Sequence, residues 1–321
     1  MQDQLLTYML AFRKLRIDRS HGVAPHKPVL LLSVLQAYQN CLIISERIYI
    51  TPELVALFKT NWSLLVTTQH DCRISYPFYY LKSEKFWKLI PKSGFENINE
   101  MGSIMKSFSN LNAAVDFAII NDDLFLLMQD NKSNSILQEF LLDEYFPLTK
   151  TNFTNSITGQ QRLFNDIEGK ILNEKPSEYQ QEIKQLMQQN NDEEIFLRGS
   201  IFKREVPKIY NYTCCISGMK IAATISVSMI DACHIVPFSE SYDDTITNGI
   251  SLCPNLHRAF DRGLISVDDN YKVLIKSSWR EEQSQYSIKQ FEGKQILLPS
   301  NPSQFPSLDN FHAHRNRFDF F

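Results

Sequence analysis

The segment of residues 231–269 constrains the fold more than any other part of this chain. Its apolar pattern predicts a strand that carries His234, a polar loop that ends at Asn248, a second short strand, and a helix that carries His257. The spacings between the three residues are 14 and 9 positions. A strand hairpin followed by a helix can place both imidazoles around one small site. The sequence therefore predicts a compact chemical centre in this segment.

Two histidines and an asparagine in this order suit metal-assisted hydrolysis of a phosphodiester. One imidazole can remove a proton from water, and a divalent cation can offset charge on the scissile phosphate and on the leaving oxygen. An amide side chain can fix the loop and the orientation of a histidine. Spacing alone nevertheless favours a purely structural role, because such combinations often arise by chance.

The residues around the three positions resemble the HNH, or ββα-metal, endonuclease family over about residues 205–280. The resemblance implies that His234 is the general base, that Asn248 is the motif asparagine, and that His257 is a metal ligand. It also implies one divalent metal ion, for which Mg²⁺ or Mn²⁺ is expected. The matching stretches are ACHIVP at 232–237, NGI at 248–250, LC at 252–253, NLHR at 255–258, FDRG at 260–263 and LISVDD at 264–269.

The second metal ligand is less clear from the sequence. Many members of the family carry an acidic residue directly before the first histidine, but Cys233 stands there and the nearest carboxylate is Asp231. In a regular strand Asp231 and His234 point to opposite faces, so Asp231 reaches the site only if the strand is irregular. Asn255 is the other candidate, with helix capping as its alternative role. Arg258, on the predicted helix, is a candidate phosphate contact.

The cysteines and the apolar pattern indicate where in the cell the protein is found. Four of the six cysteines lie near the motif, and none forms a CxxC knuckle, so buried thiols are expected rather than structural zinc. The chain has no run of about 18 uncharged apolar residues, and polar residues occupy the start where a signal peptide is apolar. A cytoplasmic protein without membrane contact is therefore predicted.

Two blocks in the first 150 residues could recognise a ligand. The stretch APHKP at 24–28 places His26 and Lys27 at the start of a predicted helix, where backbone N–H groups favour an anion. The stretch YPFYY at 76–80 opens an aromatic hairpin predicted over residues 76–90 and holds a rigid proline among aromatic rings. Composition alone favours the plainer interpretation, in which the prolines shape helices and the rings belong to the core.

Together with the HNH segment, these blocks resemble the phosphorothioate-dependent restriction endonucleases over most of the chain, residues 150–200 excepted. In that family an N-terminal sulfur-binding domain receives the sulfur that replaces one phosphate oxygen in a small apolar pocket built around a proline. The resemblance implies that Tyr76 and Pro77 line the pocket and that His26 and Lys27 contact the modified linkage. It implies double-stranded DNA as the partner and a restriction role in phage defence.

Two departures from the family leave alternatives open. Lys27 stands where the family often has arginine and offers no planar fork, and Tyr80 stands where a small residue would leave more room. Either departure could change the preferred modification or remove the sulfur dependence. The protein could then be an HNH restriction enzyme that reads another modification or a short unmodified sequence. A DNA reader with a non-catalytic HNH scaffold is the third hypothesis, because no carboxylate directly precedes His234.

The predicted architecture is α+β in three parts. Residues 1–150 form a DNA-recognition domain of helices and a hairpin, residues 151–200 a polar linker or bridging helices, and residues 201–321 the HNH domain with a C-terminal tail. The net charge of −3 alone argues against a partner such as DNA, but it hides a mildly basic first segment, with +4 over residues 1–100. Cutting of both strands by a single-site nuclease favours a homodimer.

Overall fold

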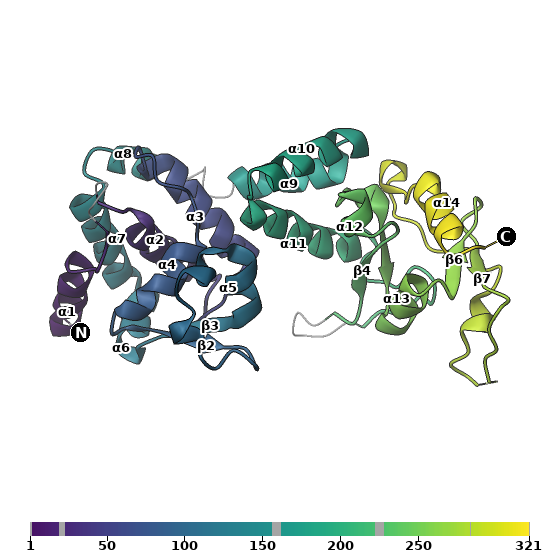
Figure 1. Ribbon diagram of the computed structural model, residues 1–321, viewed down its shortest axis with the longest axis horizontal. Coiled ribbons are helices and arrows are strands. Elements are labelled where there is room, and N and C mark those ends of the chain that lie inside the picture. The colour runs from purple at the N-terminus through teal and green to yellow at the C-terminus, as the bar shows by residue number, and fades with distance from the viewer. Residues whose placement is uncertain (1, 19–22, 156–161, 222–227, 283, 321) are drawn as a thin grey trace. The chain divides into compact units, whose positions relative to one another are not determined.

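The chain divides into two compact units, Met1–Asn165 and Asp166–Phe321 (Figure 1). The computed structural model describes residues 2–18, 23–155, 162–221, 228–282 and 284–320. Helices dominate both units, and the strands that the structure describes pair in small antiparallel sheets. This confirms the predicted α+β class.

The first unit combines helices with a three-stranded antiparallel sheet of order β1–β3–β2. Ala118 at the centre of β3 lies opposite Ile48 on one neighbour and Leu89 on the other. The strands are β1 (Arg47–Ile48), β2 (Trp87–Pro91) and β3 (Val115–Ile120), and the helices are α1 (Gln2–Arg13), α2 (His26–Gln39), α3 (Pro52–Leu65), α4 (Ser75–Tyr80), α5 (Phe108–Ala114), α6 (Asp122–Gln129), α7 (Asn131–Tyr145) and α8 (Lys150–Asn155).

Helix α2 is the centre of the first unit. Its apolar run 29–35 is buried, and the helix packs against α3, α4 and α7. Helix α3 begins as predicted, because Pro52 occupies its first turn and the Thr51 side chain accepts a hydrogen bond from the Leu54 N–H. Burial of α2 on all sides positions its first turn, and with it His26, beside α4.

The aromatic hairpin predicted over residues 76–90 is wrong. Residues Ser75–Tyr80 form helix α4, and only Trp87–Pro91 is a strand, which pairs with β3 rather than with the aromatic block. Pro77 lies in the first turn of α4, where a missing N–H leaves no helical hydrogen bond unmade. Phe78 and Tyr79 are both buried, although neighbouring residues in a strand with one exposed face would alternate between core and solvent. The aromatic run therefore belongs to a short buried helix.

Other local predictions in the first unit also need correction. The strand predicted over 42–50 is reduced to Arg47–Ile48, because β1 pairs with β3 over two residues only. The region 100–146 holds three α-helices instead of two, and a strand, Val115–Ile120, lies between the first and the second. This strand is the middle of the sheet and was missed, because its six residues follow a short helix without a turn signal.

The second unit contains a β4–β5 pair, a β6–β7 pair and helices on either side in sequence. His234 lies opposite Gly249 in the first pair, and Ile265 opposite Ile275 in the second. Of the strand or strand pair predicted over residues 225–235, residues 225–227 lie outside the described part, and the structure has a strand at Asp231–His234. The elements are α9 (Arg162–Asn173, whose larger part lies in this unit), α10 (Pro176–Gln188), α11 (Asp192–Ile209), β4 (Asp231–His234), α12 (Phe238–Ser241), β5 (Gly249–Leu252), α13 (Pro254–Asp261), β6 (Ile265–Val267), β7 (Val273–Ile275) and α14 (Leu308–Arg317).

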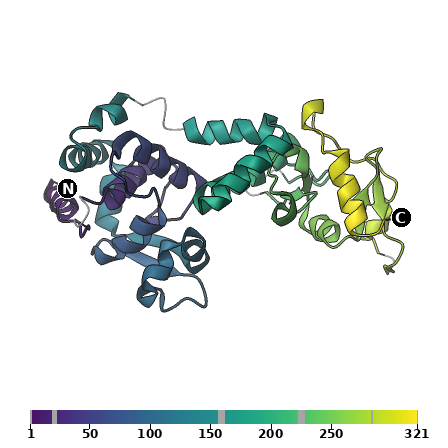
Figure 2. The ribbon, with the colours of Figure 1, turned by 45° about the horizontal axis from the view of Figure 1, so that its top comes forward.

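Helices α10 and α11 pack against each other, and α11 also packs on β4 and β5 (Figure 2). The fully buried Arg198 on α11 forms ion pairs with Glu182 on α10 at 2.8 Å and with Glu194 at 3.0 Å. Removing one partner of such a buried pair is costly, so these contacts hold the two helices in one arrangement. Helix α11, which begins within the segment predicted as a linker or bridging helices, thus packs on the strand that carries His234.

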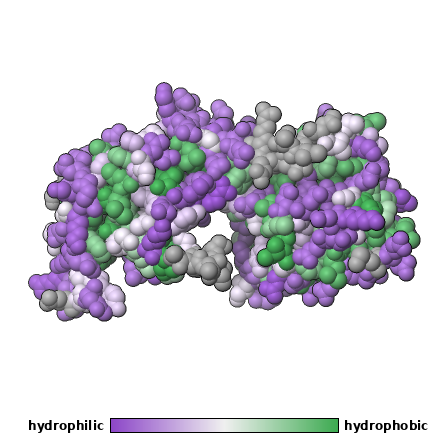
Figure 3. Space-filling view, turned by 180° about the vertical axis from the view of Figure 1, so that it is seen from behind, coloured by the Kyte–Doolittle hydropathy of each residue, from purple (hydrophilic) through white to green (hydrophobic). Residues whose placement is uncertain are grey.

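None of the described helices is long and apolar enough to cross a membrane. On the face of the molecule shown in Figure 3, hydrophilic residues are interspersed with apolar ones over both units. Mixed surfaces of this kind are ordinary, because polar atoms are too few to cover a folded protein.

Candidate active site

Strands β4 and β5 and helix α13 bring the two motif histidines to one pocket. His234 is the last residue of β4, and His257 lies in the middle of α13. Both line a pocket of about 290 Å³, together with Asp261 and Arg317. The predicted grouping of two imidazoles from a hairpin and a following helix is therefore present.

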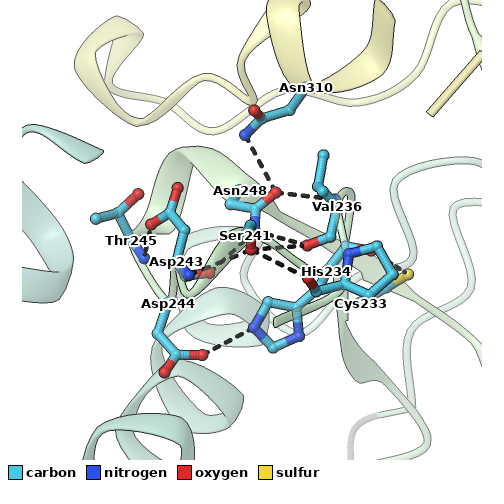
Figure 4. Close-up of polar contacts among 10 residues, drawn as sticks. Cys233, His234, Val236, Ser241, Asp243, Asp244, Thr245, Asn248 and Asn310 are labelled. Carbon is cyan, nitrogen blue, oxygen red and sulfur yellow. Dashed lines mark hydrogen bonds and ion pairs between the residues drawn. The ribbon is translucent and has the colours of Figure 1, made fainter. Parts of the chain in front are cut away.

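His234 is held on two sides, by Asp244, as Figure 4 shows, and by Phe202. Its Nε2 lies 2.8 Å from Oδ1 of Asp244, whose side chain is 2% exposed. Its ring stacks on Phe202 of α11, with centroids 4.0 Å apart and planes inclined by 11°. An ionised carboxylate can only accept, so Nε2 carries the proton and Nδ1 keeps its lone pair. The arrangement presents a ring of defined orientation with one basic nitrogen.

Asn248 is buried and ties the two ends of the loop between β4 and β5 together (Figure 4). Its Oδ1 accepts from the N–H of Val236 at 3.0 Å and from Nδ2 of Asn310 at 3.1 Å. Its Nδ2 donates to the carbonyl oxygens of Val236 and Asp243, each at 2.9 Å. The loop that leaves His234 and returns with Asp244 is thus closed around one amide side chain, in agreement with the loop-fixing role predicted for it.

Gly249 allows α11 to pack closely against β5. A Cβ at this position would lie 2.6 Å from Cγ2 of Val206 and 2.9 Å from Cε2 of Phe202. Both distances are too short for real contacts, so any larger residue would push α11 away from β5. The Asn248–Gly249 pair therefore serves two purposes, because the asparagine closes the loop and the glycine admits the ring that stacks on His234.

Two carboxylates flank His257. Its Nδ1 lies 3.5 Å from Oδ2 of Asp231, and its Nε2 lies 3.4 Å from Oδ2 of Asp261. Asp261 lines the pocket with both histidines, whereas Asp231 stands at the other nitrogen of the ring. Asp261 was missed as a candidate ligand, although its spacing of four residues from His257 places both on one face of a helix.

The donor atoms in this group suit a divalent cation. Ligand atoms of Cys233, His257 and Asp261 lie within 4.8 Å of one another. Cys233 is completely buried, and burial raises the pKa of its thiol. Its Sγ donates to Oδ1 of Asp261 at 3.8 Å, so it acts as a neutral partner rather than a thiolate ligand. Imidazole and carboxylate remain as the groups that could hold a metal ion, and Asp231 lies where it could orient His257 through the second nitrogen.

Asn255 and Arg258, which were also predicted for this site, lie outside the pocket that holds the two histidines. Asn255 does not cap α13, because Cys253 is the residue at the cap position and Pro254 occupies the first turn. Asn255 is exposed, and neither it nor Arg258, which is also exposed, lines the pocket. Cys214, Cys215, Cys233 and Cys253 are buried free thiols within the core of the second unit.

In the first unit, the five residues predicted to contact DNA lie together. They line one pocket of about 430 Å³ between the start of α2 and α4, with Arg16, His70 and Lys106 among the further lining residues. Aromatic rings form part of the wall, where the ring of His26 lies 5.4 Å from that of Tyr76. The ring of Trp62, which does not line the pocket, lies 4.7 Å from that of His26. The predicted residues are His26, Lys27, Tyr76, Pro77 and Tyr80.

Lys27 is engaged within the protein. Its Nζ donates to Oε1 of Glu84 at 2.5 Å and to Oγ of Ser83 at 2.8 Å, and its side chain is 7% exposed. Burial lowers the pKa of Lys27, and the carboxylate of Glu84 opposes that shift. The exposed cations at the pocket are Arg16 and Lys106, which the sequence interpretation did not single out.

His26 contributes a neutral ring to the same pocket. Burial lowers its pKa, and its Nε2 lies 2.9 Å from the carbonyl oxygen of Asp71, which can only accept. The imidazole therefore donates to the protein backbone and offers its ring to the pocket wall. Apolar and aromatic groups line the space together with the cations Arg16 and Lys106 and the carboxylate of Asp18.

The fold and the site define the class of the second unit as an HNH endonuclease domain. Residues 214–268 match the HNH endonuclease family. Among solved structures, a modification-dependent TagI restriction endonuclease is similar at 22% identity, over 36% of this chain and 36% of that chain, with a TM-score of 0.27. This chain thus spans about a third of the length of that relative. No curated protein matches.

Proposed function

We propose that the protein is a modification-dependent restriction endonuclease that binds phosphorothioate-modified double-stranded DNA and hydrolyses it at the HNH site with one divalent metal ion. The observation that carries the proposal is the presence, in a chain with an HNH domain, of an aromatic pocket around Pro77 with cations at its edge. Sulfur is larger and less strongly hydrated than oxygen, so an apolar wall favours it, while the cations hold the rest of the phosphate.

The chemistry follows from the groups around His234. Its Nδ1 accepts a proton from water as the water attacks the scissile phosphorus. Asp244 fixes the tautomer and stabilises the imidazolium that forms, and Phe202 keeps the ring in one plane. His257 and Asp261 would hold the metal ion, which when bound offsets charge on the phosphate and the leaving oxygen.

The backbone contacts in the first unit are assigned differently from the sequence expectation. Because Lys27 is buried against Glu84, we assign it to supporting the pocket. Arg16 and Lys106 are assigned to the phosphates, since both are exposed at the same pocket. Arg258, exposed on α13, is kept as a contact to a flanking phosphate, because it does not reach the pocket that holds His234.

Matched plasmids with and without phosphorothioate linkages test the specificity. We expect the modified plasmid to be cut about 100-fold faster in Mg²⁺ or Mn²⁺, because this ratio corresponds to a preference of the apolar pocket for sulfur of about 2.7 kcal/mol. Lys106→Ala should weaken binding to the modified DNA about tenfold and lower its salt dependence. The exposed Lys132, far from this pocket in sequence and absent from its lining, provides the matched alanine control.

Equal cutting of both plasmids would remove the sulfur specificity and leave the nuclease in place. The runner-up would then be an HNH restriction enzyme that reads another modification or a short unmodified sequence, and a binding panel of modified duplexes would identify it. Tyr80, whose ring lines the pocket and limits its space, is the observation that favours this alternative. A cytoplasmic location and a homodimer that cuts both strands stay predictions.

Titration with Mn²⁺ tests the metal ligands without any DNA. His257→Ala and Asp261→Ala should each lower the affinity for Mn²⁺ by about 100-fold or more, since each removes a donor atom. Asp231→Ala should cost about tenfold, because it removes only the carboxylate that orients His257. If Asp231→Ala and Asp261→Ala cost the same, the assignment of Asp261 as ligand and Asp231 as outer partner is reversed or shared.

A further inference from the structure

The C-terminal helix α14 brings a cation into the nuclease pocket. Arg317 is the last residue of α14, and it lines the same pocket as His234, His257 and Asp261. It lies far beyond residues 214–268, which match the HNH family. Arg317 is therefore not part of the HNH motif, although it lines the same pocket.

The charge balance of the pocket shows what Arg317 adds. A DNA phosphate is anionic, and Asp261 places another negative charge in the same space. His314 also lines the pocket, but burial lowers its pKa to about 4, so its ring is neutral at neutral pH. Among the described residues that line this pocket, Arg317 is the one whose positive charge is permanent.

Helix α14 is anchored firmly enough to present a side chain at a defined place. His314 lies with Nδ1 2.9 Å from Oγ of Ser266 and with Nε2 3.1 Å from the carbonyl oxygen of Phe260, on whose ring it stacks at 3.8 Å. Arg315 donates to the carbonyl oxygen of Val267 at 2.6 Å. The end of α14 is thus fixed to α13, the helix of His257, and to β6.

The chain just after Arg317 packs equally closely. Gly263 has a φ of +63°, and a Cβ there would lie 2.2 Å from Cγ of Phe318. Phe318 lines the nuclease pocket beside Arg317. Because a glycine is required for this contact, the turn after α13 is shaped to receive the end of α14.

The present partner of Arg317 can be replaced by a phosphate. Its Nη1 lies 2.7 Å from Oε1 of Glu240 on α12, and the two side chains are 40% and 52% exposed. An exposed ion pair of this kind contributes about 1 kcal/mol or less. A guanidinium can form two parallel hydrogen bonds to a phosphate, and this geometry is stronger and more specific than a single exposed pair.

We propose that Arg317 binds the phosphate that is cleaved and that Glu240 holds its side chain when no DNA is present. The inference rests on the nuclease activity of the HNH domain and is independent of the recognition of sulfur. In this proposal the cation that balances the negative charge of the substrate and of Asp261 comes from α14, a helix outside the motif.

Cleavage kinetics of the full chain and its variants, in Mg²⁺ or Mn²⁺, test the proposal. Arg317→Ala should lower kcat/KM about 100-fold, as removal of one group that stabilises the transition-state charge does. Arg317→Lys should recover about tenfold of this loss, because lysine restores the positive charge but not the two parallel hydrogen bonds of the guanidinium group. Glu240→Gln should match the wild type or bind DNA more tightly, since it releases Arg317. Arg280→Ala, an exposed arginine of the same unit outside the pocket, is the control.

The Glu240 variant separates substrate binding from a structural role. If the ion pair merely holds the fold, Glu240→Gln and Arg317→Ala should lose activity and thermal stability together, and the proposal is overturned. It is also overturned if Arg317→Ala cuts within about threefold of the wild type, a difference of well under 1 kcal/mol. Equal cutting of modified and unmodified DNA by the wild type would remove the sulfur specificity only, and the comparison at Arg317 would stand.

A binding measurement gives a readout that needs no cleavage. In a His234→Ala background, adding Arg317→Ala should weaken binding of a short unmodified duplex about tenfold and reduce the slope of affinity against salt by about one phosphate contact. Identical affinity and an identical slope in the two proteins would contradict a phosphate contact at Arg317.

Discussion

Replacing His234 by alanine should abolish DNA cleavage and leave DNA binding unchanged. The variant removes the nitrogen that we propose accepts the proton of water, and loss of such a base costs about 10²–10⁴-fold in rate. His234 is only partly buried, and its ring stacks on Phe202 at the edge of the β4–β5 pair, so the fold should survive. Initial rates on plasmid DNA and affinity for a short duplex should be measured on the same preparation.

The control for this prediction is His312→Ala. His312 is exposed on α14 in the same unit and does not line the nuclease pocket, so its removal should change neither rate nor binding. Full activity of the His234 variant would remove the assigned base. A parallel loss of binding would show that the residue organises the site instead of accepting a proton.

Replacing Asn248 by alanine should lower both activity and stability. The side chain is fully buried and makes hydrogen bonds to both backbone groups of Val236, to the carbonyl of Asp243 and to Asn310. Its removal leaves several buried groups without partners, which costs about 3 kcal/mol of the free energy of unfolding. The loop that carries Asp244 would loosen, so the orientation of His234 would be lost as well.

Thermal or denaturant unfolding of the full chain measures this effect, with cleavage rates measured below the transition. Asn270→Ala is the matched control, because Asn270 is exposed in the β6–β7 turn of the same unit. A variant at Asn248 that keeps wild-type stability and loses only activity would place the amide in the chemistry rather than in the loop. The contrast with His234, where we expect the rate to fall far more than the stability, separates the two roles.

The local part of the nuclease site could be predicted because its signals are local. His234 ends a strand, Asn248 closes a loop, and His257 lies on a helix that starts at Pro254, and the three residues fall within 24 positions of the sequence. The neighbouring short hairpin, β6–β7, also follows its turn signal at 268–270. In each case the pattern of apolar residues and the turn residues decide the element before any distant contact forms.

The aromatic block of the first unit shows where local reasoning fails. Tyr76, Phe78 and Tyr80 alternate as a strand would, and aromatic residues favour strands. The block is helical because Phe78 and Tyr79 are buried side by side, Phe78 against the ring of Trp87 at 5.3 Å. The packing of two buried faces outweighs propensity in so short a segment, and no pattern within the block reveals its partners.

The sequence by itself determined the class of chemistry, because the ββα segment holds the proposed base, the loop amide and the first proposed metal ligand within one short stretch. Only the tertiary structure decided what surrounds them. Phe202 comes from a helix before the motif, Arg317 from a helix after it, and Asp244 reaches His234 because Asn248 closes the loop. Lys27 likewise shows its partner, Glu84, only in the folded chain. Such contacts join different elements of the fold. Which residues pair depends on tertiary packing, and the local pattern of apolar residues does not predict it.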